Sequence, residues 1–568
     1  MPLHYRGRPT VAAITPCDLM TRLYIYADDS MRGREAGTPD AIRATAYIES
    51  QVRALGLQPA GDKGSFFMNM PVTEVYVDSA STVTVGGTTY HVYRDFGTGQ
   101  AVDRQVSGEV VFGGVRGDTV NPLAPDQVQG KIVLLLPAAG GAGGRGGFGG
   151  RGGVPNFRAV NPLAGAAAIA TISPTIATGR IGYTLDDTIE QEGVAAYRAA
   201  HPNQNAGGRG GRGGRGGAGG AGDLNITVTP GLAAAMLGKA PDQAAKGDKG
   251  ATVAINVRGI EAPAPTRSVV AILPGTDPVL RNQYIVIGGH SDHIGTHGTP
   301  VEHDSLKAYN EIAQTEGAER TGRLVPNAEE CARINAIKDS LRRIYPARMD
   351  SISNGADDDG SGSVSVLEIA EAFAKGHIKP KRSLIFIWQT GEEKGLWGSL
   401  YFTNHPTVPR DSIVADLNID MVGRGEASDV TGRSKAGSEL HGNPDYLQLV
   451  GSRRLSTELG DIAESVNKTE KVPLEFDYSM DADGHPQRIY CRSDHYEYAR
   501  YGIPVIFFTT GGHADYHHVT DEPQYIQYRH MARVDQLIFD IAVRVGDLDH
   551  RPVVDKAKQD SPFGRCQQ

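Results

Sequence analysis

From residue 266 onward, short apolar runs alternate with longer stretches whose apolar residues follow helical spacing. Helical spacing covers residues 363–376 and 525–546. The apolar runs are rich in β-branched residues and lie at 268–273 (SVVAIL), 284–289 (YIVIGG), 383–390 (SLIFIWQT), 412–419 (SIVADLNI) and 504–509 (PVIFFT). Such alternation is typical of helices covering a sheet. The pattern therefore predicts an α/β fold with a mixed, largely parallel twisted sheet.

The first 264 residues show two other patterns. Residues 17–58 predict two amphipathic helices around a Gly-Thr-Pro turn. From about residue 70 to about 262, short segments such as SGEVVFGG and GKIVLLLPA predict strands, with one helix near 231–237. A chain of 568 residues is too long for one ordinary domain. We therefore expect two or three domains, one of them rich in strands.

Two Gly/Arg-rich segments, 140–153 and 207–222, interrupt the strand-rich region. Glycine at this density does not offset its own ordering entropy, so we expect both to be mobile loops. RGG repeats can also bind RNA through arginine charge and stacking. The chain as a whole carries a net charge of −9, which argues against a protein that seeks nucleic acid.

Other features of the composition narrow the class of protein. No run of about 18 apolar residues occurs, so no membrane span is expected. The sequence as given opens MPLHYRGRPT, without the pattern of a signal peptide. The four cysteines include no CxxC pair and indicate neither a disulfide framework nor a zinc finger. We interpret Cys491 as a small buried hydrophobic residue.

Histidines and carboxylates follow four of the predicted strands, at the point where each strand ends. In such sheets, sites form just beyond the carboxyl ends of the strands. The residues concerned are His290 and Asp292, Glu392 and Glu393, Asp420, and the Asp515-Tyr516-His517 run. So much negative charge at one edge is costly unless it is neutralised. Divalent metals would neutralise it, and a mixed N/O set without thiolate suits zinc, manganese or cobalt.

The sequence NGADDDGSG at 354–362 adds three adjacent aspartates to this inventory. Read from Asp357, with Glu368 at position 12, it is close to an EF-hand calcium loop. The preceding YPARMDSISNGA makes a poor incoming helix, and Glu368 falls within a continuous helical pattern. A solvated acidic turn is the remaining alternative to a metal ligand.

Five short motifs follow one another along the chain. They are H-x-D (290–292), G-A-D-D-D-G-S-G (355–362), G-E-E-x-G (391–395), N-I-D-M-V-G (418–423) and Y-H-x-x-x-D (516–521). In this order they resemble the M28 family of dinuclear zinc aminopeptidases, and S-D-H-Y-x-Y-x-x-x-G-I-P at 493–504 looks like its bacterial branch.

The resemblance covers about residues 17–75 and 266–548, and it implies a zinc exopeptidase fold. The strand-rich segment between them looks like the protease-associated (PA) domain that many members carry as an insertion. The expected organisation is an N-terminal part of the peptidase domain at 1–75, a β-rich PA-like domain at 76–264, a catalytic core at 265–550, and a C-terminal tail at 551–568.

The resemblance also implies a set of metal ligands. Asp358 matches the carboxylate that bridges the two metals. One zinc would be bound by His290 and Asp420, and the other by Glu393 and His517. Two Zn²⁺ per chain are therefore expected, replaceable by Mn²⁺ or Co²⁺. The family often has a cis peptide after the bridging aspartate. His293, His297, His495, His513 and His518 remain outside this set.

Three further residues match catalytic roles. Glu392 matches the general base, Asp292 the carboxylate that orients His290, and Tyr516 a donor to the developing oxyanion. The chemistry suits these residue types, because a carboxylate beside a metal-activated water can take its proton and pass it to the leaving amine. A histidine ligand held by a carboxylate keeps the correct tautomer.

The expected activity is removal of N-terminal residues from peptides, without nucleic-acid or membrane partners. The alternatives are a carboxypeptidase or dipeptidase of the same family, and a calcium-binding or protein-interaction module. The resemblance implies a secreted or periplasmic location. An unusual insertion at 296–350 contains a predicted helix at 327–344. This insertion either lies over the site and restricts substrate size, or projects from the surface without contacting the site.

Overall fold

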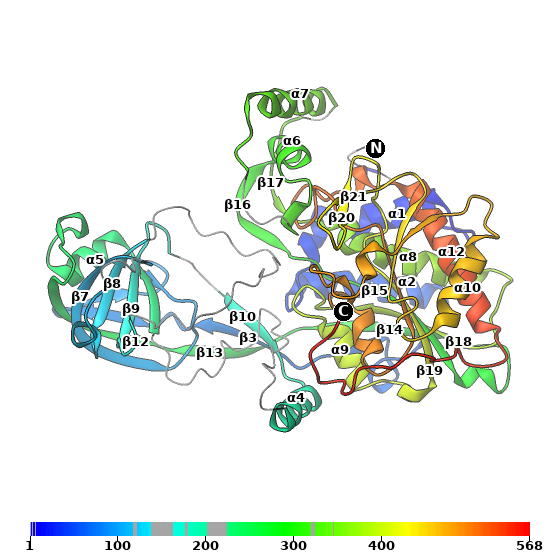
Figure 1. The fold of residues 1–568 in the computed structure, drawn as a ribbon, viewed down its shortest axis with the longest axis horizontal. Helices are drawn as coiled ribbons and strands as arrows, with labels where there is room; N and C mark the ends of the chain where they lie inside the picture. The colour runs from blue at the N-terminus through cyan, green and yellow to red at the C-terminus, as the bar shows by residue number, and fades with distance from the viewer. Residues whose placement is uncertain are drawn as a thin grey trace.

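The computed structural model has two lobes joined by a narrow connection (Figure 1). It describes the whole chain except residues 1, 3, 6, 118–121, 138–162, 177–179, 202–223, 320–323 and 345. The Gly/Arg-rich segments expected to be mobile therefore lie almost entirely outside the described residues.

A nine-stranded sheet forms the centre of the larger lobe. Its strands run in the order β1 (Gln58–Pro59), β14 (Arg267–Leu273), β18 (Ser383–Gln389), β15 (Tyr284–His290), β19 (Ile413–Ile419), β24 (Val505–Thr509), β22 (Tyr446–Val450) and β23 (Glu475–Asp477), with β2 (Phe67–Asn69) also paired to β14. The four central strands β18, β15, β19 and β24 are parallel. The outer pairs β14–β18 and β22–β24 are antiparallel. The predicted mixed, largely parallel sheet is confirmed.

Helices cover both faces of this sheet. On one face lie α1 (Pro16–Tyr26), α2 (Pro39–Ala54), α8 (Gly362–Lys375), α10 (Thr457–Asn467) and α12 (Tyr528–Gly546). On the other lie the shorter helices α9 (Trp397–Asn404) and α11 (His495–Ala499). Successive strand residues alternate between the two cores: Phe386 packs under α8, whereas Ile385 and Ile387 pack beneath α9. Burial on both faces explains why these strands read as continuous apolar runs.

The predicted pair of N-terminal helices begins each time at a Thr-Pro step. The Thr15 side chain accepts a hydrogen bond from the Asp18 N–H, and that of Thr38 accepts one from the Asp40 N–H. Proline follows each threonine at a position where its missing N–H costs nothing. Both helices belong to the larger lobe, as the sequence indicated.

The smaller lobe contains an eight-stranded sheet. Its strands are β5 (Thr88–His91), β4 (Thr82–Val85), β12 (Lys249–Val257), β7 (Arg104–Val115), β8 (Ile132–Leu136), β9 (Ala168–Ile172), β11 (Leu224–Val228) and β6 (Phe96–Gly97), with helices α3 (Pro125–Val128) and α5 (Pro230–Leu237). Helix α5 is the one predicted near 231–237. Its buried face contributes to a core separate from those of the larger lobe.

A three-stranded sheet of β10 (Arg180–Leu185), β3 (Val72–Val77) and β13 (Gly259–Ala264) forms the connection between the lobes (Figure 1). Helix α4 (Thr188–Ala200) follows β10 and packs on the larger lobe. Its Glu190 pairs with Arg500 at 2.7 Å, and Asp187, just before it, accepts a hydrogen bond from Asn404. Part of the segment assigned to the β-rich domain therefore contacts the α/β lobe.

The insertion at 296–350 contains a hairpin of β16 (Thr296–Glu302) and β17 (Met349–Ile352) with helices α6 (His303–Ala313) and α7 (Ala328–Ile344). Helix α7 confirms the helix predicted there, and none of its residues is buried. It projects from the molecule beyond α6 (Figure 1).

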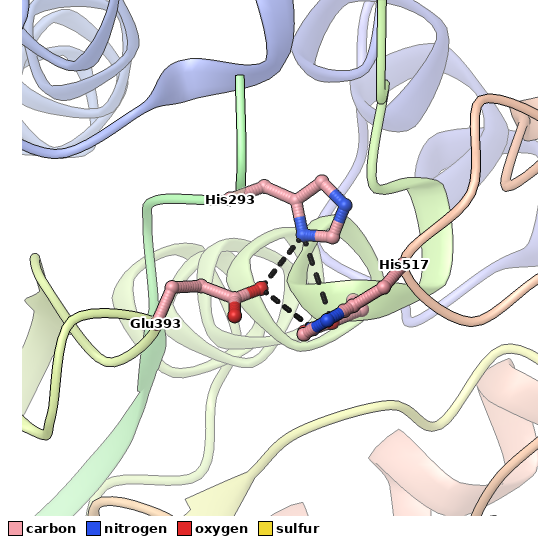
Figure 2. Close-up of side chains that lie close together, drawn as sticks. His293, Glu393 and His517 are labelled. Carbon is pink, nitrogen blue, oxygen red and sulfur yellow. Dashed lines mark ion pairs between the residues drawn. The ribbon is translucent and has the colours of Figure 1, made fainter. Parts of the chain in front are cut away.

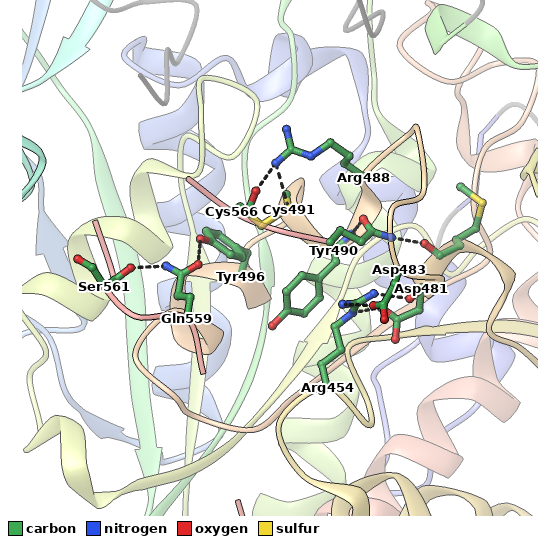
Figure 3. Close-up of a disulfide and its surroundings, with 12 residues drawn as sticks. Arg454, Asp481, Asp483, Arg488, Tyr490, Cys491, Tyr496, Gln559, Ser561 and Cys566 are labelled. Atoms are coloured by element: carbon green, nitrogen blue, oxygen red, sulfur yellow. Dashed lines mark hydrogen bonds and ion pairs between the residues drawn. A yellow bond between two sulfur atoms is a disulfide. The ribbon is translucent and has the colours of Figure 1, made fainter. Parts of the chain in front are cut away.

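One expectation about cysteine is wrong. Cys491 is bonded to Cys566 in a disulfide, which attaches the C-terminal tail to the loop before α11 (Figure 3). The tail makes further contacts with this loop, because Gln568 accepts a hydrogen bond from Tyr490 N–H and donates one to the Met480 carbonyl. Two isolated cysteines 75 residues apart gave no sequence pattern that predicts their pairing.

Of the helices within the described ranges, none combines the length and apolar character needed to cross a bilayer.

Candidate metal centre

The four parallel strands deliver their following residues to one edge of the sheet. Strand β15 ends at His290, which is in register with Gln389 at the end of β18. Glu393 follows β18 after a short turn, and Asp420 follows β19 directly. The loop after β24 carries His517. These side chains come together because parallel strands end on the same side.

Asp358 lies between the two histidines. One carboxylate oxygen, Oδ1, is 3.1 Å from His290 Nε2, and the other, Oδ2, is 2.9 Å from His517 Nε2. The peptide bond between Asp358 and Asp359 is cis, as the resemblance suggested. With one oxygen facing each group, the side chain is placed where a bridging ligand would have to be.

On one side of Asp358 lie His290 and Asp420. His290 Nε2 is 3.6 Å from Asp420 Oδ1. The other oxygen of Asp420 accepts a 2.7 Å hydrogen bond from the Ser493 hydroxyl, which in turn accepts one from the Asn418 amide. Ser493, the first residue of the S-D-H-Y motif, thus fixes the orientation of the Asp420 carboxylate.

On the other side of Asp358 lie Glu393, His517 and His293 (Figure 2). Glu393 Oε1 is 3.1 Å from His517 Nε2 and 2.9 Å from His293 Nδ1. His293 Nδ1 is also 3.6 Å from Asp358 Oδ2. Sequence reasoning left His293 outside the ligand set, whereas the structure places its ring inside the cluster.

The two aspartates beside Asp358 have separate partners. Asp357 accepts a hydrogen bond from the Gly423 N–H at 2.6 Å and lies 3.2 Å from His513 Nε2. Asp359 accepts hydrogen bonds from the backbone N–H groups of His290 and Met421. All three aspartates are buried, so the solvated-turn interpretation is wrong.

The EF-hand interpretation is also wrong at its twelfth position. Glu368 lies on helix α8, where its carboxylate pairs with Arg22 of α1 at 3.1 Å. It is directed into the contact between two helices, away from the Asp357–Asp359 turn.

The residues predicted to act in catalysis adjoin the cluster. His290 Nδ1 is 3.1 Å from the Asp292 carbonyl oxygen and 3.7 Å from its carboxylate. The Asp292 carboxylate accepts hydrogen bonds from Gly391 and Glu392 N–H, so it also holds the turn that carries Glu392. The Tyr516 ring stacks on that of His517, with centroids 4.0 Å apart.

Burial and neighbouring charge separate the pKa values of the two adjacent glutamates. Burial raises the pKa of Glu392 well above its usual range, and the charge of Glu393 adds to this. Burial also raises the pKa of Glu393, but the imidazoles of His517 and His293 outweigh it and lower the pKa to about 2. One glutamate is thus held as an anion beside the histidines, and the other favours holding a proton.

The donor set fits zinc ions. Six atoms of the cluster are buried without a hydrogen-bond partner among the described residues: His290 Nε2, His293 Nδ1 and Nε2, His517 Nε2, Asp358 Oδ2 and Glu393 Oε1. Buried polar groups without partners are rare because they are costly. Imidazole nitrogens and carboxylate oxygens directed at one another form the ligand chemistry of zinc.

Sequence reasoning missed Arg34, which holds the cluster together from outside. Its guanidinium is fully buried and donates to four backbone carbonyls: Tyr26, Ser291, Asn354 and Gly355. It therefore ties the end of α1 to the His290–His293 loop and to the turn that precedes Asp358. An arginine in the MRGREAG stretch gives no sequence signal for such a role.

Comparison with protein families gives a match over residues 268–542 to the family described as peptidase family M28. The match covers just under half of the chain. The matched segment contains every residue of the cluster described above.

Relatives match part of this chain over part of their own length. Leupeptin-inactivating enzyme 1 of Streptomyces exfoliatus is 41% identical over 80 residues, 14% of this chain and 18% of the relative. A probable leucine aminopeptidase of Arthroderma benhamiae is 34% identical over 107 residues, 18% and 29% of the two chains. Leucine aminopeptidase 1 of Aspergillus oryzae is 26% identical over 208 residues, which are 35% of this chain and 48% of the relative. The chain thus spans less than half the length of each.

Solved structures are similar along most of the chain at low identity. An aminopeptidase from Aneurinibacillus sp. strain AM-1 is 16% identical, covers 96% of each chain, and has a TM-score of 0.45. A zinc aminopeptidase from Bacillus subtilis is 13% identical, with 97% of this chain and 100% of the other covered and a TM-score of 0.49.

A pocket opens beside the candidate metal ligands. Its lining includes Asp358, Glu392, Asp420 and Tyr516. Its apolar wall consists of Met421, Val430, Met480, Ile489 and Phe507. A pocket with an apolar wall next to polar catalytic groups is the usual form of a substrate site.

The insertion at 296–350 contributes to this pocket as well. Glu316 and Glu319, which follow helix α6, line it, while helix α7 projects outward. Glu319 forms two ion contacts with Arg492 on the opposite wall, one of them at 3.1 Å. Glu316 pairs with Arg433 at 2.6 Å. The segment after α6 therefore borders the pocket, as the first alternative for the insertion proposed, whereas α7 is a projection from the surface, as the second proposed.

Proposed function

We propose that the chain is a metallo-exopeptidase that removes N-terminal amino acids from peptides. In this proposal two zinc ions are held by His290, Asp358, Asp420, Glu393 and His517. The observation that supports it most is that one pocket is lined by Asp358, Asp420 and Glu392 together. When bound, two zinc ions lower the pKa of a shared water and polarise the scissile carbonyl.

The chain's own residues would then move the proton. Glu392 takes a proton from the attacking water and passes it to the leaving amine. Asp292 keeps this carboxylate in place through its hydrogen bonds to the Gly391–Glu392 backbone. Tyr516, which lines the pocket, supplies a hydroxyl donor to the developing oxyanion.

Charge in the pocket supports an aminopeptidase over a carboxypeptidase or dipeptidase. The described lining residues include five carboxylates, Glu316, Glu319, Asp358, Glu392 and Asp420, and the guanidinium of Arg492. Arg492 is already paired with Glu319. A substrate carboxylate would need an unpaired cation, whereas a peptide's N-terminal ammonium finds anions.

We also propose that the protein works outside the cytoplasm, in a secreted or periplasmic location. The Cys491–Cys566 disulfide supports this, because disulfides form and persist in oxidising compartments.

The proposal is tested with a panel of aminoacyl anilides, the same compounds with acetylated N-termini, and peptides with a free or amidated C-terminus. We expect chelator-sensitive release from the free anilides only. Hydrolysis that requires a free C-terminus would identify a carboxypeptidase instead. No hydrolysis of any substrate by the zinc-loaded protein would contradict the proposal and favour a binding module.

A substitution tests the general base separately. Glu392→Gln keeps the size of the side chain but removes the group that takes the proton, so turnover should be lost while the zinc content stays near that of the unmodified chain. Glu329→Gln, on the exposed helix α7, is the matched control. Residual activity above a few per cent in Glu392→Gln would show that another group is the base.

A further inference from the structure

The cluster on the Glu393 side of Asp358 contains one more ligand-type side chain than the predicted set. We propose that His293 is a fourth protein ligand of the metal bound by Glu393, His517 and Asp358. This inference rests on the proposed two-zinc function, and it makes the two metal sites unequal.

The separations between the atoms suit one zinc ion. Two atoms each about 2.1 Å from a tetrahedral zinc lie about 3.4 Å apart. His293 Nδ1 is 2.9 Å from Glu393 Oε1 and 3.6 Å from Asp358 Oδ2. His517 Nε2 is 3.1 Å and 2.9 Å from the same two atoms. Both histidines thus face the same two carboxylate oxygens, with His293 nearer to Glu393 and His517 nearer to Asp358.

The His293 ring has no other partner that explains its position. It is fully buried, Nε2 has no hydrogen-bond partner among the described residues, and Nδ1 faces Glu393 Oε1 and Asp358 Oδ2. A buried imidazole in this state is costly unless it binds a metal. Its ring and that of His517 meet edge to face, with centroids 5.5 Å apart (Figure 2).

The surrounding backbone is shaped to admit this ring. A Cβ atom at Gly355 would come within 2.5 Å of His293 Cγ, and the φ angle of +54° at Gly355 also favours glycine. The backbone N–H of His293 donates to the Arg34 carbonyl, and Arg34 in turn donates to the Gly355 carbonyl. The first glycine of the G-A-D-D-D-G motif therefore leaves room for His293.

This arrangement predicts different affinities at the two sites. His293, Glu393, His517 and Asp358 offer four atoms on one side. On the other side His290, Asp420 and the second oxygen of Asp358 offer three, because both oxygens of the nearby Asp359 already accept hydrogen bonds from backbone N–H groups. A fourth protein ligand adds to the zinc affinity of the Glu393 site, and zinc can become five-coordinate when it also binds the shared water. The Glu393 site should therefore fill first when the metal-depleted chain is titrated.

The test measures zinc binding rather than activity. The full chain is depleted of metal with a chelator, checked for retained fold by circular dichroism, and titrated with zinc against a competing chelator. The variants are His293→Ala, and His293→Gln, whose amide still hydrogen-bonds to Glu393 but is a poor zinc ligand. His297→Ala is the control, because its ring lies 2.7 Å from the Ser353 hydroxyl outside the cluster.

We expect both His293 variants to lose the tighter zinc by more than about 100-fold in affinity, beyond the 10–100-fold typical of an outer hydrogen-bond partner. X-ray absorption on the unmodified chain should show three histidine nitrogens shared by two zinc ions. The proposal is overturned if His293→Gln restores the affinity, if both variants keep both zinc ions within about 10-fold, or if only two histidines are seen. Binding of fewer than two zinc ions by the unmodified chain would overturn the two-zinc function itself.

Discussion

The Asp292 carboxylate accepts a hydrogen bond from the backbone N–H of Glu392, with 3.2 Å between Oδ1 and N. The same oxygen is 2.7 Å from Gly391 N and 3.7 Å from His290 Nδ1. One side chain thus hydrogen-bonds to the turn that carries the proposed general base, and its charge lies beside Nδ1 of a proposed zinc ligand, which is closer to the Asp292 carbonyl oxygen at 3.1 Å.

Asp292→Ala should therefore lower kcat and zinc affinity together. Loss of an outer partner of a ligating histidine typically costs 10–100-fold in metal affinity or activity. Zinc competition and steady-state kinetics on the same preparation measure the two effects. A fall in zinc affinity with kcat unchanged at saturating zinc would show that Asp292 acts on His290 alone.

Replacing Arg34 should destabilise the larger lobe. Arg34→Met leaves four buried carbonyls without their donor, and each unsatisfied group costs about 1–3 kcal/mol. We expect the apparent melting temperature to fall by several degrees. Arg32→Met is the control, since that side chain is 55% exposed and pairs with Asp40. Equal melting temperatures for the two variants would contradict the bridging role.

A buried ion-pair group in the larger lobe should make stability depend on pH. Burial raises the pKa of Glu368 to about 7, although Arg22 opposes this. An unfolded glutamate has a pKa near 4.3, so between about pH 4.3 and 7 the folded chain holds a proton that the unfolded chain releases. The contribution of Glu368 to the free energy of unfolding therefore falls as pH rises through this window, by at most about 4 kcal/mol.

Glu368→Gln is neutral at every pH and lacks this dependence. The melting temperature of the unmodified chain, relative to that of Glu368→Gln, should decrease from pH 5 to pH 8. Thermal unfolding of both proteins in the same buffers measures the difference. A difference that stays constant across the range would mean that Glu368 is ionised throughout.

The ion pair across the pocket should influence which N-terminal residue is accepted. Glu319→Ala removes the carboxylate that neutralises Arg492, and the guanidinium then faces the pocket unpaired. We expect the ratio of kcat/KM for acidic over apolar aminoacyl anilides to rise about 10-fold or more, as one unscreened charge contact is worth more than about 1.4 kcal/mol. Glu329→Ala on α7 should leave the ratio unchanged. An unaltered ratio in Glu319→Ala would place substrate side chains away from Arg492.

The disulfide should stabilise one wall of the pocket. Cys566→Ser releases the tail from the loop that carries Met480, Gln487 and Ile489, all of which line the pocket. A lower melting temperature, consistent with the loss of about 2–4 kcal/mol typical for a disulfide, and a higher KM are expected. Cys17→Ser, at an exposed free cysteine, is the control. An unchanged KM in Cys566→Ser would show that the attachment of the tail does not influence substrate binding.

Much of the fold could be predicted because its causes are local. The apolar runs at 284–289 and 383–390 are long enough for buried strands. The segments beside them place their apolar residues at helical spacing. The side chains that follow strands were also predictable as neighbours, because parallel strands end at one edge. Asp358 was distinguished from Asp357 and Asp359 only by resemblance to a family.

Other features depend on contacts between residues far apart in the chain, which no local pattern encodes. Arg34 meets Asn354 across 320 residues, and Cys491 meets Cys566 across 75. His293 was interpreted as a loop histidine because its type and spacing are uninformative alone. Its place in the cluster follows from the backbone path at Gly355 and Arg34. Local sequence patterns predicted the central strands, several of the helices that cover them, and the sheet edge that carries the candidate site. Only the tertiary structure decided which buried side chains meet there, because that depends on how separate loops pack.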